Sequence, residues 1–215
     1  MSVPRALTSL KQGTGPQVLE VYIDILCPYS AKIFRSLTDN VIPLVSQGGK
    51  YAGKLSVVTW IYPQSFHYLS MIHAEAVYIF SSRYPDLSWE YMTSLFDTQQ
   101  DFFNVPSQSL TISEARNKLT ELALDVLESN GALDAGPRSQ AFGELRAAME
   151  VRVGQDGGIN GGNEGSDWVK YMIKRGRQNG VHVTPTALFD GLKDDSVSSS
   201  WGKDEWEKWL AAKLV

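Results

Sequence analysis

The residues best suited to chemistry in this sequence form one short run, Cys27-Pro28-Tyr29-Ser30. Cys27 is the only cysteine of the 215 residues, and it directly precedes a proline, which favours the first turn of a helix. A thiol at a helix N-terminus meets unpaired backbone N–H groups and the positive end of the helix dipole, and both favour the thiolate. The position therefore predicts a nucleophilic sulfur, whereas a lone cysteine elsewhere is more often a small buried apolar residue.

Ser30 is the expected hydrogen-bond donor to this sulfur. A thiolate that persists near neutral pH needs about 3 kcal/mol of stabilisation, of which a helix dipole supplies about 0.3–1 kcal/mol. Direct hydrogen bonds must supply much of the difference, and the Ser30 hydroxyl, three residues after Cys27, is positioned to be one donor. An ordinary first-turn serine is the alternative interpretation, and Tyr29 is interpreted as a packing or rim residue.

Thr184-Pro185, within the apolar range 181–191, forms a second candidate element. Proline removes a donor from a strand and is disfavoured inside a central strand. A cis bond before Pro185 would account for its presence, and it would leave the Thr184 backbone free to pair with an extended thiol substrate beside Cys27. A trans proline at the start of a strand is the alternative.

The elements expected to position these residues alternate in type. The range 16–26 and the range Leu55–Ile61 are rich in β-branched and apolar residues, which predicts two buried strands. Between them, apolar residues from Ala31 to Leu44 recur every three or four positions, which predicts a helix beginning at Pro28. The spacing favours parallel strands joined by this helix.

The middle of the chain is expected to be helical, and several helix starts carry a capping residue, Ser113 among them. The Gly-rich stretch 154–165 lacks a Gly-Lys-Ser/Thr ending and follows a predicted helix, so we interpret it as an interhelical loop and not as a phosphate-binding loop. The helices expected from apolar spacing cover 72–84, 88–103, 113–129, 139–153 and 167–179, with a last one over 200–214.

Composition is ordinary for a soluble globular protein, with 43% hydrophobic and 20% charged residues and a net charge of −4. No stretch concentrates Lys and Arg, so nucleic acid is not an expected partner. The range 1–18 lacks the apolar core of a secretory signal or a membrane span, which predicts a cytoplasmic or otherwise reducing location and no membrane association. With His73 and His182 far apart and a single cysteine, no metal-ligand spacing occurs, and no metal is expected.

These elements together resemble the thioredoxin superfamily, and in particular its DsbA-like branch. The run 27–30 resembles the Cys-Pro-x-Cys active site, the segment 62–67 resembles the stretch after the second strand, and Val183-Thr184-Pro185-Thr186 resembles the cis-proline loop. The segment 200–210 resembles the last helix, so the resemblance covers the chain from Val18 onward. It implies an α/β, thioredoxin-like fold with a mixed β-sheet and a large all-helical insertion.

The resemblance also implies how the chain divides and where a substrate binds. Residues 1–65 and 181–215 would form the thioredoxin-like domain, and residues 66–180 would form the helical insertion. Asp24 is interpreted as a turn-stabilising carboxylate, with a proton acceptor as the alternative, and His67 stands at the edge of the expected cleft unless it is merely packed or solvent-facing. We expect catalysis by Cys27 and Ser30, and substrate binding by Pro28, Tyr29, His67, Val183, Thr184 and Pro185.

Ser30 marks a departure from the family, because it stands where a second, resolving cysteine is usual. A DsbA-type oxidase transfers its own disulfide, which a chain with one cysteine cannot do alone. Attack by the Cys27 thiolate on a disulfide would stop at a mixed disulfide, which an outside thiol such as glutathione would resolve. The prediction is a monothiol thiol-disulfide oxidoreductase acting with glutathione or glutathionylated substrates, with glutathione as cosubstrate and no tightly bound cofactor.

Two alternatives stay open. The Pro-Tyr-Ser run also resembles kappa-class glutathione transferases and 2-hydroxychromene-2-carboxylate isomerases, whose serine hydroxyl holds the thiolate of glutathione. A non-catalytic thioredoxin-fold binding protein is the other alternative, because the second cysteine is missing. The physiological substrate and the oligomeric state, a homodimer included, are left open.

Overall fold

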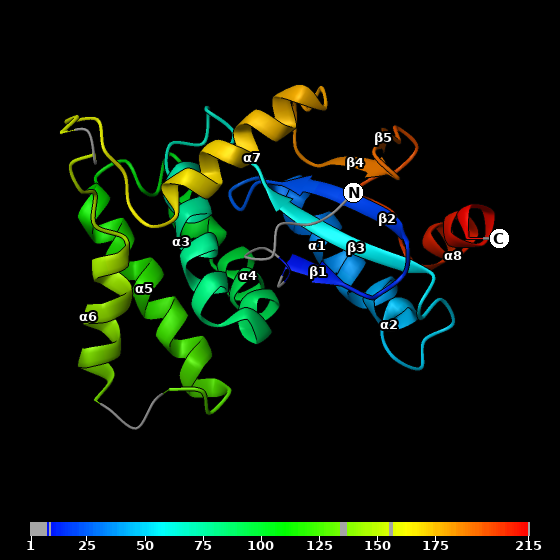
Figure 1. Cartoon of the computed structure of the whole chain (residues 1–215), viewed down its shortest axis with the longest axis horizontal. Helices are drawn as coiled ribbons and strands as arrows, with labels where there is room; N and C mark the ends of the chain where they lie inside the picture. The colour runs from blue at the N-terminus through cyan, green and yellow to red at the C-terminus, as the bar shows by residue number, and fades with distance from the viewer. Residues whose placement is uncertain (1–7, 9, 134–136, 155–156, 215) are drawn as a thin grey trace.

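The computed structural model describes residue 8 and residues 10–133, 137–154 and 157–214. A five-stranded sheet in the order β1-β3-β2-β4-β5 lies beside a group of helices (Figure 1). Strands β2 (Gln17–Ile23) and β3 (Leu55–Ile61) are parallel to each other, whereas the remaining pairs are antiparallel. The predicted α/β fold with a mixed sheet is therefore confirmed.

Helix α1 (Pro28–Asn40) connects the two parallel strands and lies behind them in Figure 1. The apolar pattern predicted a helix reaching Leu44, but α1 ends earlier and a short helix α2 (Ile42–Val45) follows it. Pro43 explains the break, because it has no N–H to donate to the Asp39 carbonyl and its ring would collide with that carbonyl.

The helical insertion lies mainly to the left of the sheet in Figure 1, and its last helix extends above the sheet. The helix expected over 88–103 is divided, and the helix expected over 139–153 stops at Ala148. The N-cap of α5 is Thr111 and not the expected Ser113, because Thr111 and Glu114 satisfy each other's backbone N–H groups in a capping box. The helices of the insertion are α3 (Ser70–Arg83), η2 (Pro85–Leu87), α4 (Ser88–Asp97), η3 (Gln99–Phe102), α5 (Ile112–Ser129), α6 (Arg138–Ala148) and α7 (Ser166–Gln178).

The chain returns to the sheet in a hairpin of β4 (Thr186–Phe189) and β5 (Leu192–Lys193). Asp190 and Gly191 connect them with φ values of 50° and 83°, as a tight two-residue hairpin turn requires. The ladder begins only after Pro185, so β4 is shorter than the predicted strand.

Two further elements complete the described structure. Helix α8 (Lys203–Lys213) buries Trp206 and Trp209, and the latter packs edge-on against Phe189 of β4. The short strand β1 (Lys11–Gln12), which the sequence did not predict, pairs antiparallel with β3. Within the described ranges, no helix combines the length and the apolar character needed to cross a membrane.

A buried ion pair fastens α7 to the sheet. Glu20 of β2 is 1% exposed, and its carboxylate accepts hydrogen bonds from the Trp60 indole at 2.6 Å and from the Arg175 guanidinium. The guanidinium also lies over the Trp60 ring, 4.8 Å from its centroid. Beside it, Gly176 packs so closely on the Tyr62 ring that a Cβ atom would come within 2.3 Å. These contacts fix α7, and with it the segment that leads into β4, relative to β2 and β3.

Replacing Glu20 by Gln should show how much the Glu20–Arg175 ion pair contributes to the free energy of unfolding. The substitution removes the charge that compensates Arg175, whose side chain is 12% exposed. Because an uncompensated buried charge is strongly unfavourable, we expect Glu20→Gln to lower the free energy of unfolding by about 3 kcal/mol. Urea denaturation measures this loss.

A matched control breaks an ion pair at the surface. Asp97→Asn removes the partner of Arg35 from a pair whose side chains are 50% and 59% exposed. Its loss should cost less than about 1 kcal/mol. Similar losses in Glu20→Gln and Asp97→Asn would show that the Glu20–Arg175 pair does not anchor α7.

Candidate active site

Cys27 is the N-cap residue of α1, directly before Pro28. Its sulfur caps no helix N–H group, and it lies instead 3.3 Å from the carbonyl oxygen of Thr184, to which the thiol donates a hydrogen bond. The peptide bond between Thr184 and Pro185 is cis. Cys27 is buried, with 6% of the residue exposed. The two elements singled out in the sequence therefore meet at this sulfur.

Strand register explains why they meet. In the antiparallel pair of β2 and β4, Tyr22 lies opposite Thr186. Residues that precede Thr186 therefore lie beside residues that follow Tyr22, which brings Thr184 to Cys27. The Thr184 N–H has no hydrogen-bond partner in the described part of the chain, and the Thr184 hydroxyl is buried without one. This backbone is open to pairing with an extended substrate.

Ser30 does not contact the sulfur as the sequence led us to expect. It is fully buried, and its hydroxyl accepts the Asp24 N–H at 3.1 Å. Among the described residues it makes no hydrogen bond with Cys27. A turn closed by the Cys27 N–H and the Asp24 carbonyl, 3.0 Å apart, brings the Asp24 backbone against the first turn of α1. The Ser30 hydroxyl thus holds the turn that precedes the thiol.

Asp24 is the centre of a buried hydrogen-bond network. It is 1% exposed, and its Oδ1 accepts the Leu26 N–H at 3.0 Å and the Ser70 hydroxyl at 2.6 Å. Its Oδ2 accepts the Gln64 N–H at 2.9 Å and lies 2.7 Å from the Nδ1 of His67. The contact with Leu26 is the turn-stabilising role expected of Asp24. The other contacts join the end of β2 to the segment after β3 and to the first turn of α3.

His67 is oriented by this carboxylate. Because the carboxylate only accepts hydrogen bonds, the Nδ1 of His67 carries the proton, and the Nε2 makes no hydrogen bond with any described residue. The ring lines two cavities, of about 510 and about 350 Å³. The smaller cavity is also lined by Leu26 and Pro28, the neighbours of Cys27 on either side. An imidazole held in this way can take up or return a proton at the wall of a cavity that the two neighbours of Cys27 also line.

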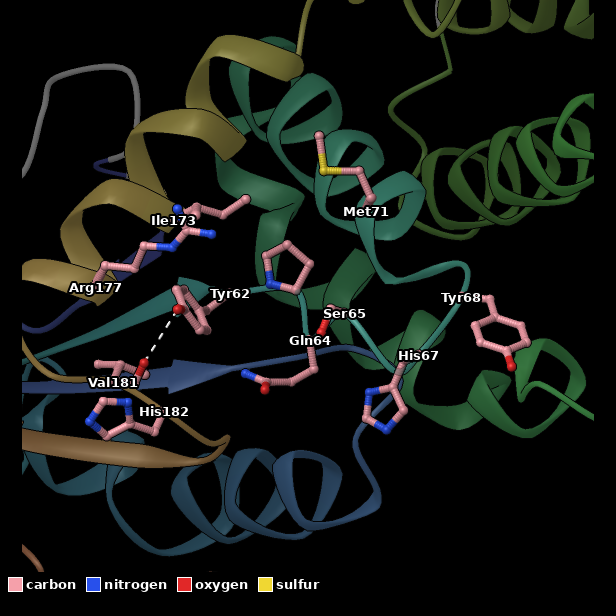
Figure 2. A pocket seen from close by; sticks show the side chains of 11 residues that line it. Tyr62, Gln64, Ser65, His67, Tyr68, Met71, Ile173, Arg177, Val181 and His182 are labelled. Atoms are coloured by element: carbon pink, nitrogen blue, oxygen red, sulfur yellow. Dashed lines mark hydrogen bonds between the residues drawn. The ribbon is translucent and has the colours of Figure 1, made fainter.

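The larger cavity lies between α7, α3 and the loop that leads to Thr184 (Figure 2). Arg177 reaches it from α7, Gln64 from the segment after β3, and His182 from the loop before Thr184. Tyr62 closes one side, and its hydroxyl donates to the Val181 carbonyl at 3.3 Å. None of the 11 lining residues is acidic.

Comparison with known proteins tests the fold. No protein-family model and no curated protein sequence matches the chain. Solved structures do match: a candidate protein-disulfide isomerase from Pseudomonas syringae is 21% identical, with a TM-score of 0.66 over 95% of this chain and 99% of that one. MdbA, a thiol-disulfide oxidoreductase from Actinomyces oris, is 16% identical, with a TM-score of 0.61 over 93% and 82%. DsbA from Chlamydia trachomatis is 14% identical, with a TM-score of 0.54 over 98% and 93%.

The chain has a DsbA-like thioredoxin fold. This confirms the resemblance that the sequence suggested, as far as the fold is concerned. Identities this low show the fold alone, and the same fold carries many functions. The chemistry of the site therefore depends on its own residues.

On this DsbA-like fold the expected substrate-binding residues fall into three groups. Thr184 and Pro185 stand at the sulfur, and Pro28 and His67 line the smaller cavity. The other two expected residues, Tyr29 and Val183, project from the surface and are 59% and 61% exposed.

The sequence reasoning missed Gln64 and Arg177, and it treated His182 only as a metal-ligand candidate. His182 stands next to the predicted cis-proline loop, which was a usable signal. No local motif marks Gln64 or Arg177 as members of a cavity. Within the described residues, no three His, Cys, Asp or Glu side chains gather to hold a metal ion.

His73 lies in the first turn of α3, three residues after Ser70, which binds Asp24. It is fully buried, its Nδ1 donates to the Leu69 carbonyl at 2.9 Å, and its ring lies edge-on to Phe102. Burial lowers the pKa of His73 to about 4, because the imidazolium would lose its hydration there. The Leu69 carbonyl and the Asp24 charge act in the opposite direction and do not overcome burial.

This buried imidazole predicts an acid-sensitive stability. The pKa of His73 falls from 6.5 to about 4 on folding, so the unfolded chain binds more protons between these values. The stabilisation is complete above pH 6.5 and is lost as the pH falls towards 4, by about 3 kcal/mol in all. His73→Asn, which does not titrate, should have a flatter dependence of unfolding free energy on pH, measured by urea denaturation from pH 7 to pH 4.

The exposed His182 provides a matched control, and the contribution of the buried imidazole is the difference in pH dependence between His73→Asn and His182→Asn. If His73→Asn loses stability with falling pH as steeply as the wild type does, another group is responsible.

Proposed function

We propose that the protein is a monothiol thiol-disulfide oxidoreductase that acts through Cys27 on glutathione or glutathionylated substrates. The observation that carries this proposal is the 3.3 Å contact between the Cys27 sulfur and the Thr184 carbonyl. It places the thiol beside a backbone N–H that is free to hold a substrate strand. The DsbA-like fold adds support, since MdbA, which shares it, is a thiol-disulfide oxidoreductase.

The proposed reaction consists of two exchange steps. In the first, the Cys27 thiolate attacks the glutathione sulfur of a mixed disulfide between a substrate and glutathione. The substrate–glutathione S–S bond breaks, a disulfide forms between Cys27 and glutathione, and the substrate sulfur leaves as a thiolate with the electron pair and takes up a proton. In the second, a glutathione thiolate attacks this adduct, releases the Cys27 thiolate and leaves as oxidised glutathione.

Ionisation of Cys27 must precede the attack. A thiolate cannot donate to the Thr184 carbonyl, so the ionised sulfur loses that contact and is drawn to the unpaired N–H groups in the first turn of α1. His67 is the residue that we assign to moving the proton, with Asp24 holding its ring in place. The Thr184 N–H would then bind a backbone carbonyl of the substrate.

The absence of a second cysteine makes the outside thiol necessary. Since Ser30 cannot resolve the adduct, the cycle depends on the local supply of reduced glutathione. We therefore also propose a cytoplasmic location, where thiols are kept reduced.

The position of Ser30 weakens the kappa-class-like transferase alternative. In that mechanism the Ser30 hydroxyl would hold the thiolate of glutathione. Here the hydroxyl is fully buried and bound to the Asp24 N–H, which leaves it no access to a ligand. The exchange reaction at Cys27 does not require the Ser30 hydroxyl to contact glutathione.

Mass spectrometry of the intact protein tests the proposal. Incubation with oxidised glutathione should add one glutathione to the wild type, and reduced glutathione should remove it, because both steps are exchanges at one sulfur. Cys27→Ser should form no adduct under either condition. Peptide mapping should locate the adduct at Cys27.

Two results would contradict the exchange mechanism. One is a wild-type protein that forms no adduct. The other is a glutathione-dependent activity that persists in full in Cys27→Ser, which would favour a transferase or isomerase. A partner that binds Cys27→Ala as tightly as the wild type, together with no adduct, would favour a non-catalytic binding protein.

A further inference from the structure

The larger cavity is lined by a cation that no acidic side chain in the described part of the chain compensates. Arg177 is exposed on α7, lines the cavity and forms no ion pair with any described residue. Arg175, two residues earlier on the same helix, is bound by Glu20. His67 and His182 also line the cavity, and no Asp or Glu does. A wall of this composition favours an anion.

A buried amide in the same cavity points to a ligand independently. Gln64 is 6% exposed, and its backbone N–H is held by Asp24. Its Nε2 is buried and has no hydrogen-bond partner among the described residues. Figure 2 shows the amide end of Gln64 directed into the space between His182 and His67. An acceptor on a ligand in the cavity would give this amide the partner that it lacks.

The cavity is within reach of the thiol. His182 lies two residues before Thr184, whose carbonyl contacts the Cys27 sulfur, so its Cα is within about 8 Å of that of Thr184. One residue of extended peptide spans about 3.5 Å. Two extended residues span about 7 Å, which is comparable to the spacing between Thr184 and His182, and both carboxylates of glutathione lie within one residue of its cysteine.

We infer that this cavity is a carboxylate subsite, in which Arg177 and the Gln64 amide bind an acidic end of the thiol substrate. The inference rests on the proposed exchange at Cys27 and names the substrate class, small anionic thiols and disulfides. The subsite would orient glutathione so that its sulfur faces Cys27 while its backbone pairs with Thr184. Neutral or cationic thiols gain no such contact.

Three small disulfides of different charge test the inference on the full-length protein. Oxidised glutathione carries carboxylates, hydroxyethyl disulfide is neutral, and cystamine is cationic. The rate of adduct formation at Cys27 is measured for each by mass spectrometry. In Arg177→Gln the rate with oxidised glutathione, relative to hydroxyethyl disulfide, should fall about ten-fold, the effect expected for losing one charged hydrogen bond at a partly exposed site. The rate with cystamine should not fall.

Two further variants separate the subsite from general charge. Lys174→Gln removes one positive charge from an exposed position of the same helix that does not line the cavity, and it should leave the ratio unchanged. Arg177→Lys retains the charge without the planar fork, and it should restore part of the preference.

The outcomes distinguish the two levels of the proposal. An unchanged ratio in Arg177→Gln, or an equal fall in Lys174→Gln, would overturn the carboxylate subsite while exchange at Cys27 still stands. A wild-type protein that reacts with none of the three disulfides would overturn the exchange reaction, and the subsite with it. Equal circular dichroism spectra and melting temperatures of the variants would show that any change in rate comes from binding.

Discussion

The buried Asp24 carboxylate is the constraint on which the site depends. A carboxylate with 1% exposure persists in the interior only when donors occupy its lone pairs. Here the donors come from the turn before Cys27, from the segment after β3 and from the start of α3, so one side chain sets their relative positions. It also orients His67. The thiol, the imidazole and one wall of the larger cavity are in this way parts of a single unit.

Local signals in the sequence were enough to predict the elements that carry the thiol. Pro28 marks a helix start from its own stereochemistry, and a run of β-branched residues marked β3 at its observed bounds. The signal for the break after α1 is also local, because Pro43 prevents a continuous helix. The regular spacing of apolar residues on both sides of Pro43 nevertheless led to the prediction of one helix. Ser30 shows the limit of such reasoning. The sequence placed Ser30 in the first turn of the helix that begins after Cys27. The partner of its hydroxyl, however, is the Asp24 N–H, which a turn of the chain brings against that helix.

Contacts between distant segments lay beyond the reach of the sequence. Arg175 and Arg177 are two residues apart on an amphipathic helix and look alike in sequence. The packing of α7 on the sheet determines that Arg175 pairs with Glu20 and that Arg177 lines the cavity. The same holds for Gln64, whose backbone is fixed by Asp24 while its amide is left without a partner. Cavities are properties of several elements at once, and periodicity describes one element at a time.

In the proposed exchange, an outside thiol takes the part that a second cysteine would play, because the chain has only Cys27. A resolving thiol at position 30 would lie in a fully buried place, against the Asp24 N–H, and the serine there stabilises the turn that carries Cys27. In the proposed exchange, resolution must then come from the solvent side. Cavities border the neighbours of Cys27 and the loop of Thr184, and the larger one is lined by Arg177, which forms no ion pair with a described residue, and by no acidic group. In the proposed exchange, the outside thiol would have to be small and acidic to use this cavity. The single cysteine and the composition of the cavity would then be two parts of one mechanism.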